Sequence, residues 1–250
     1  MNRGYYTAAQ GMINQQRILD AISNNVSNVN TAGYRKDEIV LNTFQEQLYL
    51  VSRRRKLETS GTSYQAYVDI SKTNLEQSGF EFTDSPFDVG IYGNMYFNIR
   101  YEKDGEVYQT RNGQWGLDNE GYLWLGGSGR VQGTNGDIYI GNDDFSIDEN
   151  GVIRDEQGEV IDTLLLTYIP VGSDVHKEGD SLFRYDGDPV QIPDDEDFAV
   201  IQRAYEKSNV DSVKEMTSAI DAFRMYEANS KILRGFDTIN QKSSSQIAEL

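Results

Sequence analysis

Residues 23–34 read SNNVSNVNTAGY and close a segment with the spacing of an amphipathic helix. Residues 208–211 read SNVD and open a second such segment near the C-terminus. Asparagine is a poor helix former because its side chain competes for backbone hydrogen bonds. The first stretch nevertheless holds four asparagines within seven residues: Asn24, Asn25, Asn28 and Asn30. An ordinary soluble helix does not account for them, so we expect their amides to have partners elsewhere.

Composition narrows the class of protein. The chain has 250 residues, which is enough for one or two domains with a buried core. It has no cysteine, which excludes disulfides and thiolate metal sites. We expect no membrane insertion, because no apolar run approaches the roughly 20 residues of a membrane span. The first residues, MNRGYYTAAQGM, lack the apolar centre of a cleaved secretory signal.

Acidic side chains are concentrated in the middle of the chain. The net charge at neutral pH is −17, yet residues 1–50 and 201–250 are each neutral and residues 51–80 carry +2. Residues 81–200 carry −19, which makes this part unsuited to nucleic acid or anionic lipid. The neutral ends suit close packing. The charge distribution therefore predicts separate terminal and central domains.

Both ends of the chain are predicted to be helices. An N-terminal stripe recurs at spacings of three and four: Tyr5, Ala9, Met12, Gln16, Leu19, Ile22 and Val26. Gly33 stands where a left-handed residue would cap and end this helix. The C-terminal stripe consists of Val213, Met216, Ile220, Phe223, Tyr226, Leu233, Phe236 and Ile239, with Ala219, Ala222 and Ala228 beside it.

The C-terminal helix is expected to begin near residue 208. Ser208 or Asn209 is predicted to be its N-cap, with the charge of Asp211 in the first turn. Because the stripe is nearly heptadic, the two terminal helices could wind around each other. The alternative is that each helix packs on its own globular domain.

The middle of the chain is predicted to be an antiparallel β domain. Residues 92–101 and 107–110 alternate and are rich in aromatic side chains, with a hairpin turn at Asp104-Gly105 between them. Residues 117–123 and 147–153 resemble each other, each as a strand, a glycine turn and a second strand. A turn at Gln157-Gly158 and a buried strand over residues 163–170 follow. Short strands at this spacing favour a sandwich or barrel-like domain.

Groups for catalysis or metal binding are sparse. His176, the one histidine, lies in a polar stretch with no nucleophile on a strand-to-helix elbow, and is predicted to be solvated. The acidic clusters at residues 143–144, 148–149 and 194–197 lack the spacing of an EF-hand and are predicted to be solvated turns. We expect no catalytic, cofactor-binding or metal-binding residues.

Two other functions stay open. One is a hydrolase that uses a close pair of carboxylates from the acidic region. The other is a soluble β-sandwich carbohydrate-binding module, whose candidate aromatic residues otherwise pack in the core: Tyr92, Tyr96, Trp115 and Trp124.

Three motifs in order resemble those of the bacterial flagellar rod and hook proteins. The first is GYYTAAQGM at residues 4–12, followed by Leu19-Asp20 and residues 23–34. The central one is YQTRNG at residues 108–113, followed by Asp118 and residues 121–123. The last comprises residues 208–211, Glu215-Met216, Arg224, residues 226–229 and Lys231. The length indicates a rod-type member, proximal or distal.

The resemblance implies a structural axial subunit of the flagellar basal-body rod in the cell envelope, with neither enzymatic activity nor cofactors. Such a subunit is exported unfolded through the flagellar type III apparatus without a cleaved signal. It self-associates in a helical assembly and contacts other rod and hook subunits. The result is a hollow rod that transmits torque from motor to hook.

The implied fold class is α+β, with N- and C-terminal helices paired as a coiled-coil-like layer and a central antiparallel all-β domain. We expect an N-terminal helix over residues 1–35, a linker or extended arm over 36–84, the acidic β domain over 85–200 and a C-terminal helix over 201–250. The β domain should fold alone, whereas unpartnered terminal helices should be disordered or transiently helical.

The terminal segments are expected to form the assembly interface. Buried amides can both donate and accept hydrogen bonds, so they would satisfy groups of other subunits and fix the register. The expected interface residues are Met12, Leu19, Asn24, Asn25, Asn28, Asn30, Gly33, Asn209, Asp211, Ile220, Phe223, Tyr226, Asn229 and Leu233.

Overall fold

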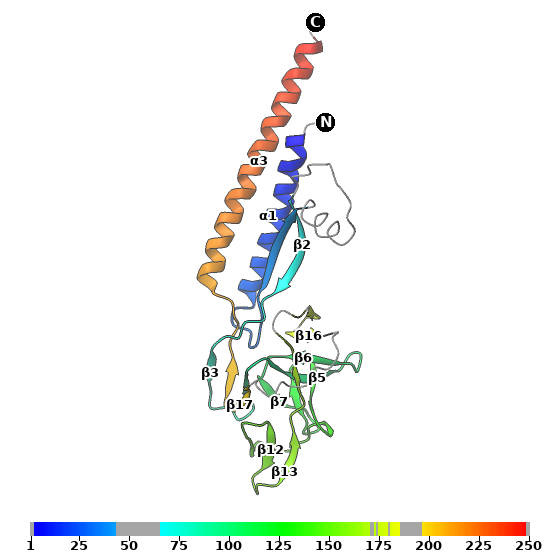
Figure 1. Ribbon diagram of the computed structural model, residues 1–250, viewed down its shortest axis with the longest axis vertical. Helices are drawn as coiled ribbons and strands as arrows, with labels where there is room; N and C mark the ends of the chain where they lie inside the picture. Colours follow the sequence, from blue (N-terminus) through cyan, green and yellow to red (C-terminus); the bar gives the residue numbers. More distant parts are fainter. Residues whose placement is uncertain are drawn as a thin grey trace, which may run out of the picture. The chain divides into compact units, whose positions relative to one another are not determined.

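The chain is divided into two compact units. The computed structural model describes residues 3–43, 66–170, 173, 175–179, 181–185 and 197–248 (Figure 1). Unit 1 is Met1–Ser27, Asp37–Thr73 and Asp211–Leu250, and unit 2 is Asn28–Lys36 and Asn74–Val210. Helices form both ends and antiparallel strands the middle, so the predicted α+β class is confirmed. No helix in these described ranges is long and apolar enough to cross a membrane.

Unit 1 contains two antiparallel helices and a hairpin. Helix α1 (Arg3–Ser27) and helix α3 (Ser212–Ala248) lie side by side and run in opposite directions (Figure 1). At 1.5 Å per residue, α3 is about 56 Å long. Strands β1 (Asp37–Thr43) and β2 (Ala66–Thr73) pair antiparallel. The basic run at residues 53–56 lies outside the described residues.

Two predicted helix boundaries are wrong. Helix α1 ends at Ser27, and Gly33 adopts its left-handed conformation (φ 65°) six residues later, so it is not the C-cap. At the other end, Asp211 rather than Ser208 or Asn209 caps α3. Its Oδ1 accepts hydrogen bonds from the N–H groups of Val213 (3.0 Å) and Lys214 (3.2 Å), which have no partner within the helix.

Unit 2 is built from antiparallel strands in several sheets. The largest has the order β15-β16-β6-β5-β9-β8-β7, with β10 on β9 and β14 on β5. Its strands are β5 (Met95–Tyr101), β6 (Val107–Thr110), β7 (Trp115–Leu117), β8 (Leu123–Leu125), β9 (Gly129–Gly133), β10 (Gly136–Asp137), β14 (Leu166–Tyr168), β15 (His176–Lys177) and β16 (Leu182–Arg184).

Three smaller sheets complete unit 2. One is three-stranded, β11-β12-β13, and the others are the pairs β17-β4 and β18-β3. These strands are β3 (Phe80–Phe82), β4 (Val89–Tyr92), β11 (Phe145–Ile147), β12 (Val152–Asp155), β13 (Val160–Thr163), β17 (Ala199–Gln202) and β18 (Ala204–Glu206).

The hydrophobic core of unit 2 lies around β5. Phe97 and Ile99 are fully buried, and the ring of Phe97 packs edge-on against Trp115 with centroids 4.8 Å apart. Tyr96 is also buried, on the other face of the strand. Two of the four aromatic candidates for carbohydrate binding, Tyr96 and Trp115, therefore belong to packed interiors.

The predicted glycine turns are confirmed, and three of them share one construction. In each, an aspartate Oδ1 accepts hydrogen bonds of 2.8–3.0 Å from the N–H groups two and four residues later. A glycine with positive φ stands three residues after the aspartate, where a side chain would be strained. The pairs are Asp118 and Gly121, Asp148 and Gly151, and Asp155 and Gly158.

Two predicted strands are broken in the structure. Residues 92–101 divide at Gly93 (φ 92°) into β4 and β5, which belong to different sheets. Residues 163–170 also divide, because β13 pairs with β12 whereas β14 pairs with β5. A chain that passes from one sheet to another must leave its first ladder, and periodicity alone does not reveal that exchange.

Candidate functional site

Glycines on α1 allow large side chains of α3 to approach its backbone. A Cβ atom built on Gly11 would lie 2.8 Å from Asn229 Nδ2, and one built on Gly4 would lie 2.6 Å from Phe236 Cζ. The two contacts are seven residues apart on both helices, with opposite chain directions. Helix positions seven apart share a face, so the contacts define one antiparallel register.

The same register continues towards the other end of the pair. Asn25 Nδ2 lies 3.5 Å from Glu215 Oε2, which is fourteen residues along both helices from the Gly11 contact. Midway, this register sets Ile18 of α1 against the buried Ala222 of α3. Large residues thus face small ones along the pair, first on α3 and then on α1.

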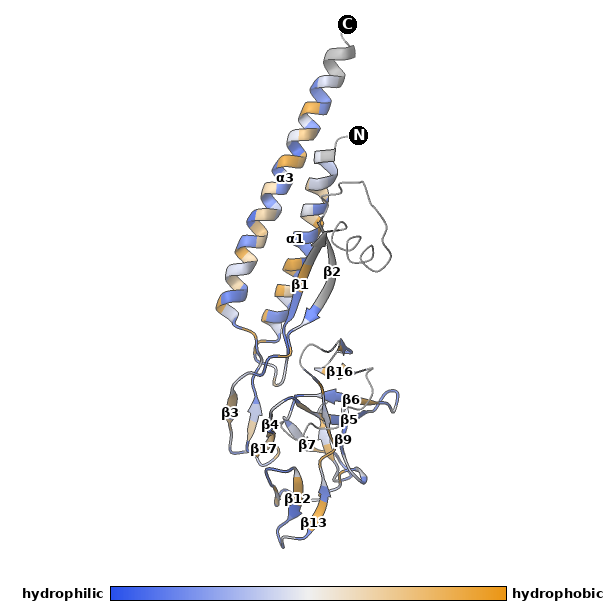
Figure 2. Cartoon of the chain, viewed as in Figure 1, coloured by the Kyte–Doolittle hydropathy of each residue, from blue (hydrophilic) through white to orange (hydrophobic). Residues whose placement is uncertain are grey.

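The apolar stripe predicted on α3 does not face α1 as a whole. The more buried residues recur at spacings of three and four: Glu215, Ala219, Ala222, Tyr226, Asn229, Leu233 and Phe236. By contrast, Ile220 is 55% exposed and Phe223 54% exposed, and Val213, Met216 and Ile239 are also exposed. Figure 2 shows apolar residues recurring along the coloured part of α3. The stripe therefore divides between two faces, an outcome that its spacing did not predict.

The expected interface residues on α1 are less exposed. Met12 and Leu19 are half-buried, as are Tyr226, Asn229 and Leu233 on α3. Ala219 and Ala222, predicted to allow close approach, are half-buried and buried, whereas Ala228 is exposed.

Asn25 has partners within its own chain. Its side chain is 2% exposed, its Oδ1 accepts from the Asp37 N–H, and its Nδ2 donates to the Asp37 carbonyl, both at 3.0 Å. One amide thus pairs with both backbone groups of the first residue of β1. Of the other asparagines, Asn24 and Asn30 are exposed and Asn28 is half-buried. Contact of these amides with another subunit stays a prediction.

Three charged side chains meet in the interior of unit 2, and we call them the ion centre: Arg35, Arg111 and Glu206. They are 0%, 1% and 0% exposed. Glu206 Oε1 accepts from Arg35 Nη1 at 2.6 Å, and Oε2 accepts from Arg111 Nη1 at 3.2 Å. The backbone N–H of Ser78 also donates to Oε1, at 2.8 Å. The charged residues come from three parts of the chain: after α1, after β6 and within β18.

Arg111 is the most thoroughly fixed of the three. Its Nη1 donates to the Ile91 carbonyl at 2.8 Å, its Nη2 donates to the Gly93 carbonyl, and its guanidinium stacks on the Tyr96 ring at 4.7 Å. Burial lowers the pKa of Arg111, and the charge of Glu206 opposes this effect. Among the residues that the structure describes, the centre holds two guanidiniums for one carboxylate, that of Glu206.

Gly33 and Asn209 join the N- and C-terminal segments of unit 2. The Gly33 N–H donates to the Glu206 carbonyl at 2.8 Å, and a Cβ on Gly33 would overlap the backbone of Arg111 and Asn112. Asn209 Oδ1 accepts from the Lys36 N–H at 2.7 Å, while its Nδ2 donates to the carbonyls of Asn74 (3.0 Å) and Glu76 (3.2 Å). Asn209 is therefore a link between three segments rather than a helix cap.

Sequence reasoning did not single out the ion centre. Two of its members stand inside or beside the motifs at residues 23–34 and 108–113, and Glu206 stands two residues before the third motif. A buried guanidinium needs an anionic partner. Arginines within two motifs are therefore the signal that could have directed a search for a nearby carboxylate such as Glu206.

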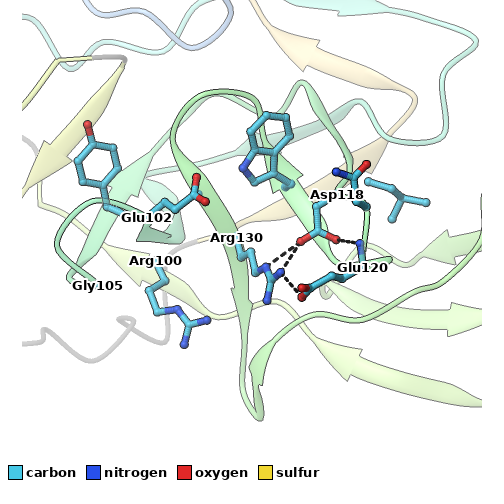
Figure 3. A pocket seen from close by; sticks show the side chains of 11 residues that line it. Arg100, Glu102, Gly105, Asp118, Glu120 and Arg130 are labelled. Atoms are coloured by element: carbon cyan, nitrogen blue, oxygen red, sulfur yellow. Dashed lines mark hydrogen bonds and ion pairs between the residues drawn. The ribbon is translucent and has the colours of Figure 1, made fainter.

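A surface pocket of about 540 Å³ opens on the largest sheet (Figure 3). Arg130 Nε donates to Asp118 Oδ2 at 2.8 Å, and its Nη2 donates to Glu120 Oε2 at 2.6 Å. Burial raises the pKa of Asp118, but backbone N–H groups and Arg130 outweigh it and hold the pKa below its usual value. Arg100 is paired with Asp137. The arginines here are committed to neighbouring carboxylates, which indicates a structural ion network.

In the described part of the chain, the other candidate residues for catalysis or metal binding do not lie together in one site. His176 lies in the two-residue strand β15 rather than in a loop, and it is exposed. Asp143 and Asp144 are exposed, and residues 194–196 lie outside the described residues. Within the described ranges, no group of three or more histidine, cysteine, aspartate or glutamate side chains is arranged to hold a metal ion.

The chain is similar to known proteins, first at its two ends and then over nearly its whole length. Residues 6–35 match the family model described as flagella basal body rod protein, and residues 201–247 match flagellar basal body rod FlgEFG protein C-terminal. The flagellar basal-body rod protein FlgG of Bacillus subtilis strain 168 is 31% identical over 262 residues, covering 97% of this chain and 98% of that protein. The chain belongs to the flagellar basal-body rod protein family.

Further relatives agree with this membership. The rod-family chain is 30% identical to the basal-body rod protein FlgG of Agrobacterium fabrum strain C58, over 94% of the chain and 95% of that protein. It is 25% identical to the hook-basal body complex protein FlhO of Bacillus subtilis over the full length of both. The predicted family is confirmed, and the carbohydrate-binding alternative gains no support. As a rod-family member the chain is a structural protein of the flagellar basal body.

Proposed function

We propose that the chain is an axial subunit of the flagellar basal-body rod and that it self-assembles through the outward faces of α1 and α3. The observation that carries this proposal is the set of exposed apolar side chains on α3. Rod-family membership supports association with other rod and hook components. The same proposal includes contact of the chain with the type III export apparatus and its assembly into a hollow rod that transmits torque. It also assigns the chain no enzymatic activity.

The outward apolar residues of α3 lie in two rows on either side of the face towards α1. Val213, Met216, Ile220 and Phe223 recur at spacings of three and four, and three of them come one residue after an inward one. At 100° per residue, this row is turned about 100° from the inward face. Met225 and Ile232 each come one residue before an inward one, so they are turned about as far in the other direction. Helix α3 is thus apolar on three sides.

Two exposed apolar rows on one helix favour neighbours on two different sides. A single two-fold dimer would bury one self-complementary patch, whereas contacts between unlike faces repeat from subunit to subunit and build a helical assembly. Each large side chain is about half exposed, so its complete burial would contribute about 1 kcal/mol. Helix α1 adds the exposed Tyr6 and Ile13. We propose other copies of this chain and its family members as the occupants of these rows.

The predicted interface residues of α3 fall into two groups, those that point outward and those that face α1. We propose that Ile220 and Phe223 contact neighbouring subunits directly. Tyr226, Asn229 and Leu233 face α1 and would shape the subunit that is assembled. The acidic β domain at residues 85–200 would then form the outer part of the subunit, as the charge distribution predicts, connected through the linker or extended arm at residues 36–84.

The test replaces Ile220 and Phe223 together by glutamine and counts basal bodies with complete rods by electron microscopy, alongside swimming motility. Both residues are exposed, so the variant should keep the wild-type circular dichroism spectrum but lose most rods. The control is Thr217→Gln, an exposed residue one turn away on the same helix. Normal rods and motility in the double variant would refute assembly through this face. Loss of rods in the control as well would show that any change to the helix is damaging.

A further inference from the structure

The ion centre of unit 2 contains more positive than negative side chains. Its net charge is positive, because Arg35 and Arg111 share one carboxylate. In the part of the chain that the structure describes, Arg35 Nε and Nη2 and Arg111 Nε are buried without a hydrogen-bond partner. A buried charge without a counter-ion is strongly destabilising. The consequences of detaching each segment therefore differ.

Detaching the N-terminal segment of unit 2 leaves a balanced centre. If residues 28–36 withdraw, Arg35 regains water around its unpaired nitrogens. Glu206 keeps Arg111 at 3.2 Å and the Ser78 N–H at 2.8 Å. One positive and one negative charge then remain, which is the arrangement that burial tolerates.

Detaching β18 while residues 28–36 stay docked leaves two buried guanidiniums and no carboxylate. The two like charges would repel each other in addition to losing hydration. The Gly33 N–H would also lose the Glu206 carbonyl, and the Lys36 N–H would lose Asn209 Oδ1. Residues 28–36 therefore have no stable site on unit 2 until β18 is in place.

We propose that unit 2 closes in a fixed order, in which β18 docks first through Glu206 and Arg111, and residues 28–36 dock last over it through Arg35. The segment nearer the N-terminus of the chain thus completes the unit. Arg35 makes the last ion pair to form, and Glu206 is the carboxylate that accepts it. This device is built into the fold and is separate from assembly through the outward faces of α3.

Hydrogen exchange of the full-length chain under native conditions tests the order. The amides of Gly33 and Lys36 report on residues 28–36, and those of Ala204 and Lys207, bonded to Asp88 and Gly79, report on β18. We expect the protection of Gly33 and Lys36 never to exceed that of Ala204 and Lys207. Higher protection of the N-terminal pair would overturn the proposal, whether or not any variant folds.

A pair of variants tests the charge argument. In Glu206→Gln we expect the unfolding equilibrium constant of unit 2 to rise about a hundred-fold or more, since two guanidiniums lose their counter-ion. Adding Arg35→Met removes one of these charges and should recover at least tenfold, measured by urea titration of tryptophan fluorescence. The control is Glu81→Gln on the neighbouring strand, an exposed partner of Lys207, which should change little.

Two outcomes of this comparison would overturn the proposal. One is a Glu206→Gln variant as stable as Glu81→Gln. The other is a double variant no more stable than Glu206→Gln, including the case in which both fail to fold. A purely steric role for Glu206 would not produce recovery when a second buried residue is replaced.

Discussion

Gly33 offers a direct measure of how closely the segment after α1 approaches the rest of unit 2. We predict that Gly33→Ala destabilises unit 2 more than the same change at Gly105. Both glycines have positive φ, 65° and 74°, so alanine is strained by about 1–2 kcal/mol at either position. Apart from its chain neighbours, no atom of the described residues lies within 4 Å of a Cβ added to Gly105, whereas at Gly33 the Arg111 carbonyl carbon would be 2.3 Å away.

The additional loss at Gly33 can be sized from this distance. Ordinary van der Waals contact begins at 3.4 Å, so the two backbones would have to separate by about 1.1 Å. Such overpacking typically costs about 1–3 kcal/mol. The movement would also stretch the Gly33 hydrogen bond to the Glu206 carbonyl, now 2.8 Å. The gain from a less flexible unfolded chain is common to both variants and cancels in the comparison.

The assay is urea unfolding followed by tryptophan fluorescence. Both tryptophans of the chain, Trp115 and Trp124, lie in unit 2, so the signal reports on that unit. With a slope of about 2 kcal/mol per molar urea, the midpoint of Gly33→Ala should be about 0.5–1.5 M below that of Gly105→Ala. Midpoints that agree within about 0.2 M would refute the close approach.

Three further predictions follow from the contacts of the terminal segments. Asn25→Asp should lower stability by about 2–4 kcal/mol in circular dichroism melts, because it loses the donor to Asp37 and buries a carboxylate beside Glu215, whereas Asn24→Asp at an exposed site should not. The N–H groups of Lys214 and then Val213 lower the pKa of Asp211. The stabilisation that Asp211 gives by capping α3 is therefore present at neutral pH and is lost as the pH falls below the usual aspartate range. The melting temperature of Asp211→Ala should be about 2–4 °C below that of the unchanged chain at pH 7, and the two should be equal in strong acid. A fragment of residues 85–200 keeps Arg111 without Glu206 and should unfold at lower urea than a fragment of residues 74–210, and equal midpoints would count against the ion centre.

Periodicity predicted the helices but not the direction in which they face. On α3, two rows of positions differ by one residue, and over residues 213–223 the row that contains Val213, Ile220 and Phe223 is the more apolar. The inward row includes Glu215, Ala219 and Asn229, which a hydrophobicity pattern ranks low. What selects that row is size, since glycines on α1 admit the larger side chains of α3. Steric fit between two segments more than 200 residues apart is not written in either segment alone.

The same limit explains which parts of unit 2 were predicted. Residues 107–110 and the turns at Asp104, Asp118 and Asp148 depend on neighbours in sequence, so local pattern was sufficient. The division of residues 163–170 between two sheets depends on distant partners, and so does the ion centre. The expected boundaries at residues 85 and 200 followed charge, whereas unit 2 also includes residues 28–36, 74–84 and 201–210.

Helix α3 keeps large apolar side chains exposed, which a self-sufficient helical hairpin would not require. A hairpin that only had to fold would turn Ile220 and Phe223 towards its partner helix and expose its alanines and asparagine. Here Ala219, Ala222 and Asn229 face α1 together with the larger Tyr226, Leu233 and Phe236, and about 1 kcal/mol of burial per outward side chain is left unused. Exposed apolar rows of this length carry a risk of non-specific association. Neighbouring subunits that cover them, as proposed above, would account for their retention, and the paired helices in unit 1, rather than the acidic β domain, are therefore the part of the chain that we expect to form the rod.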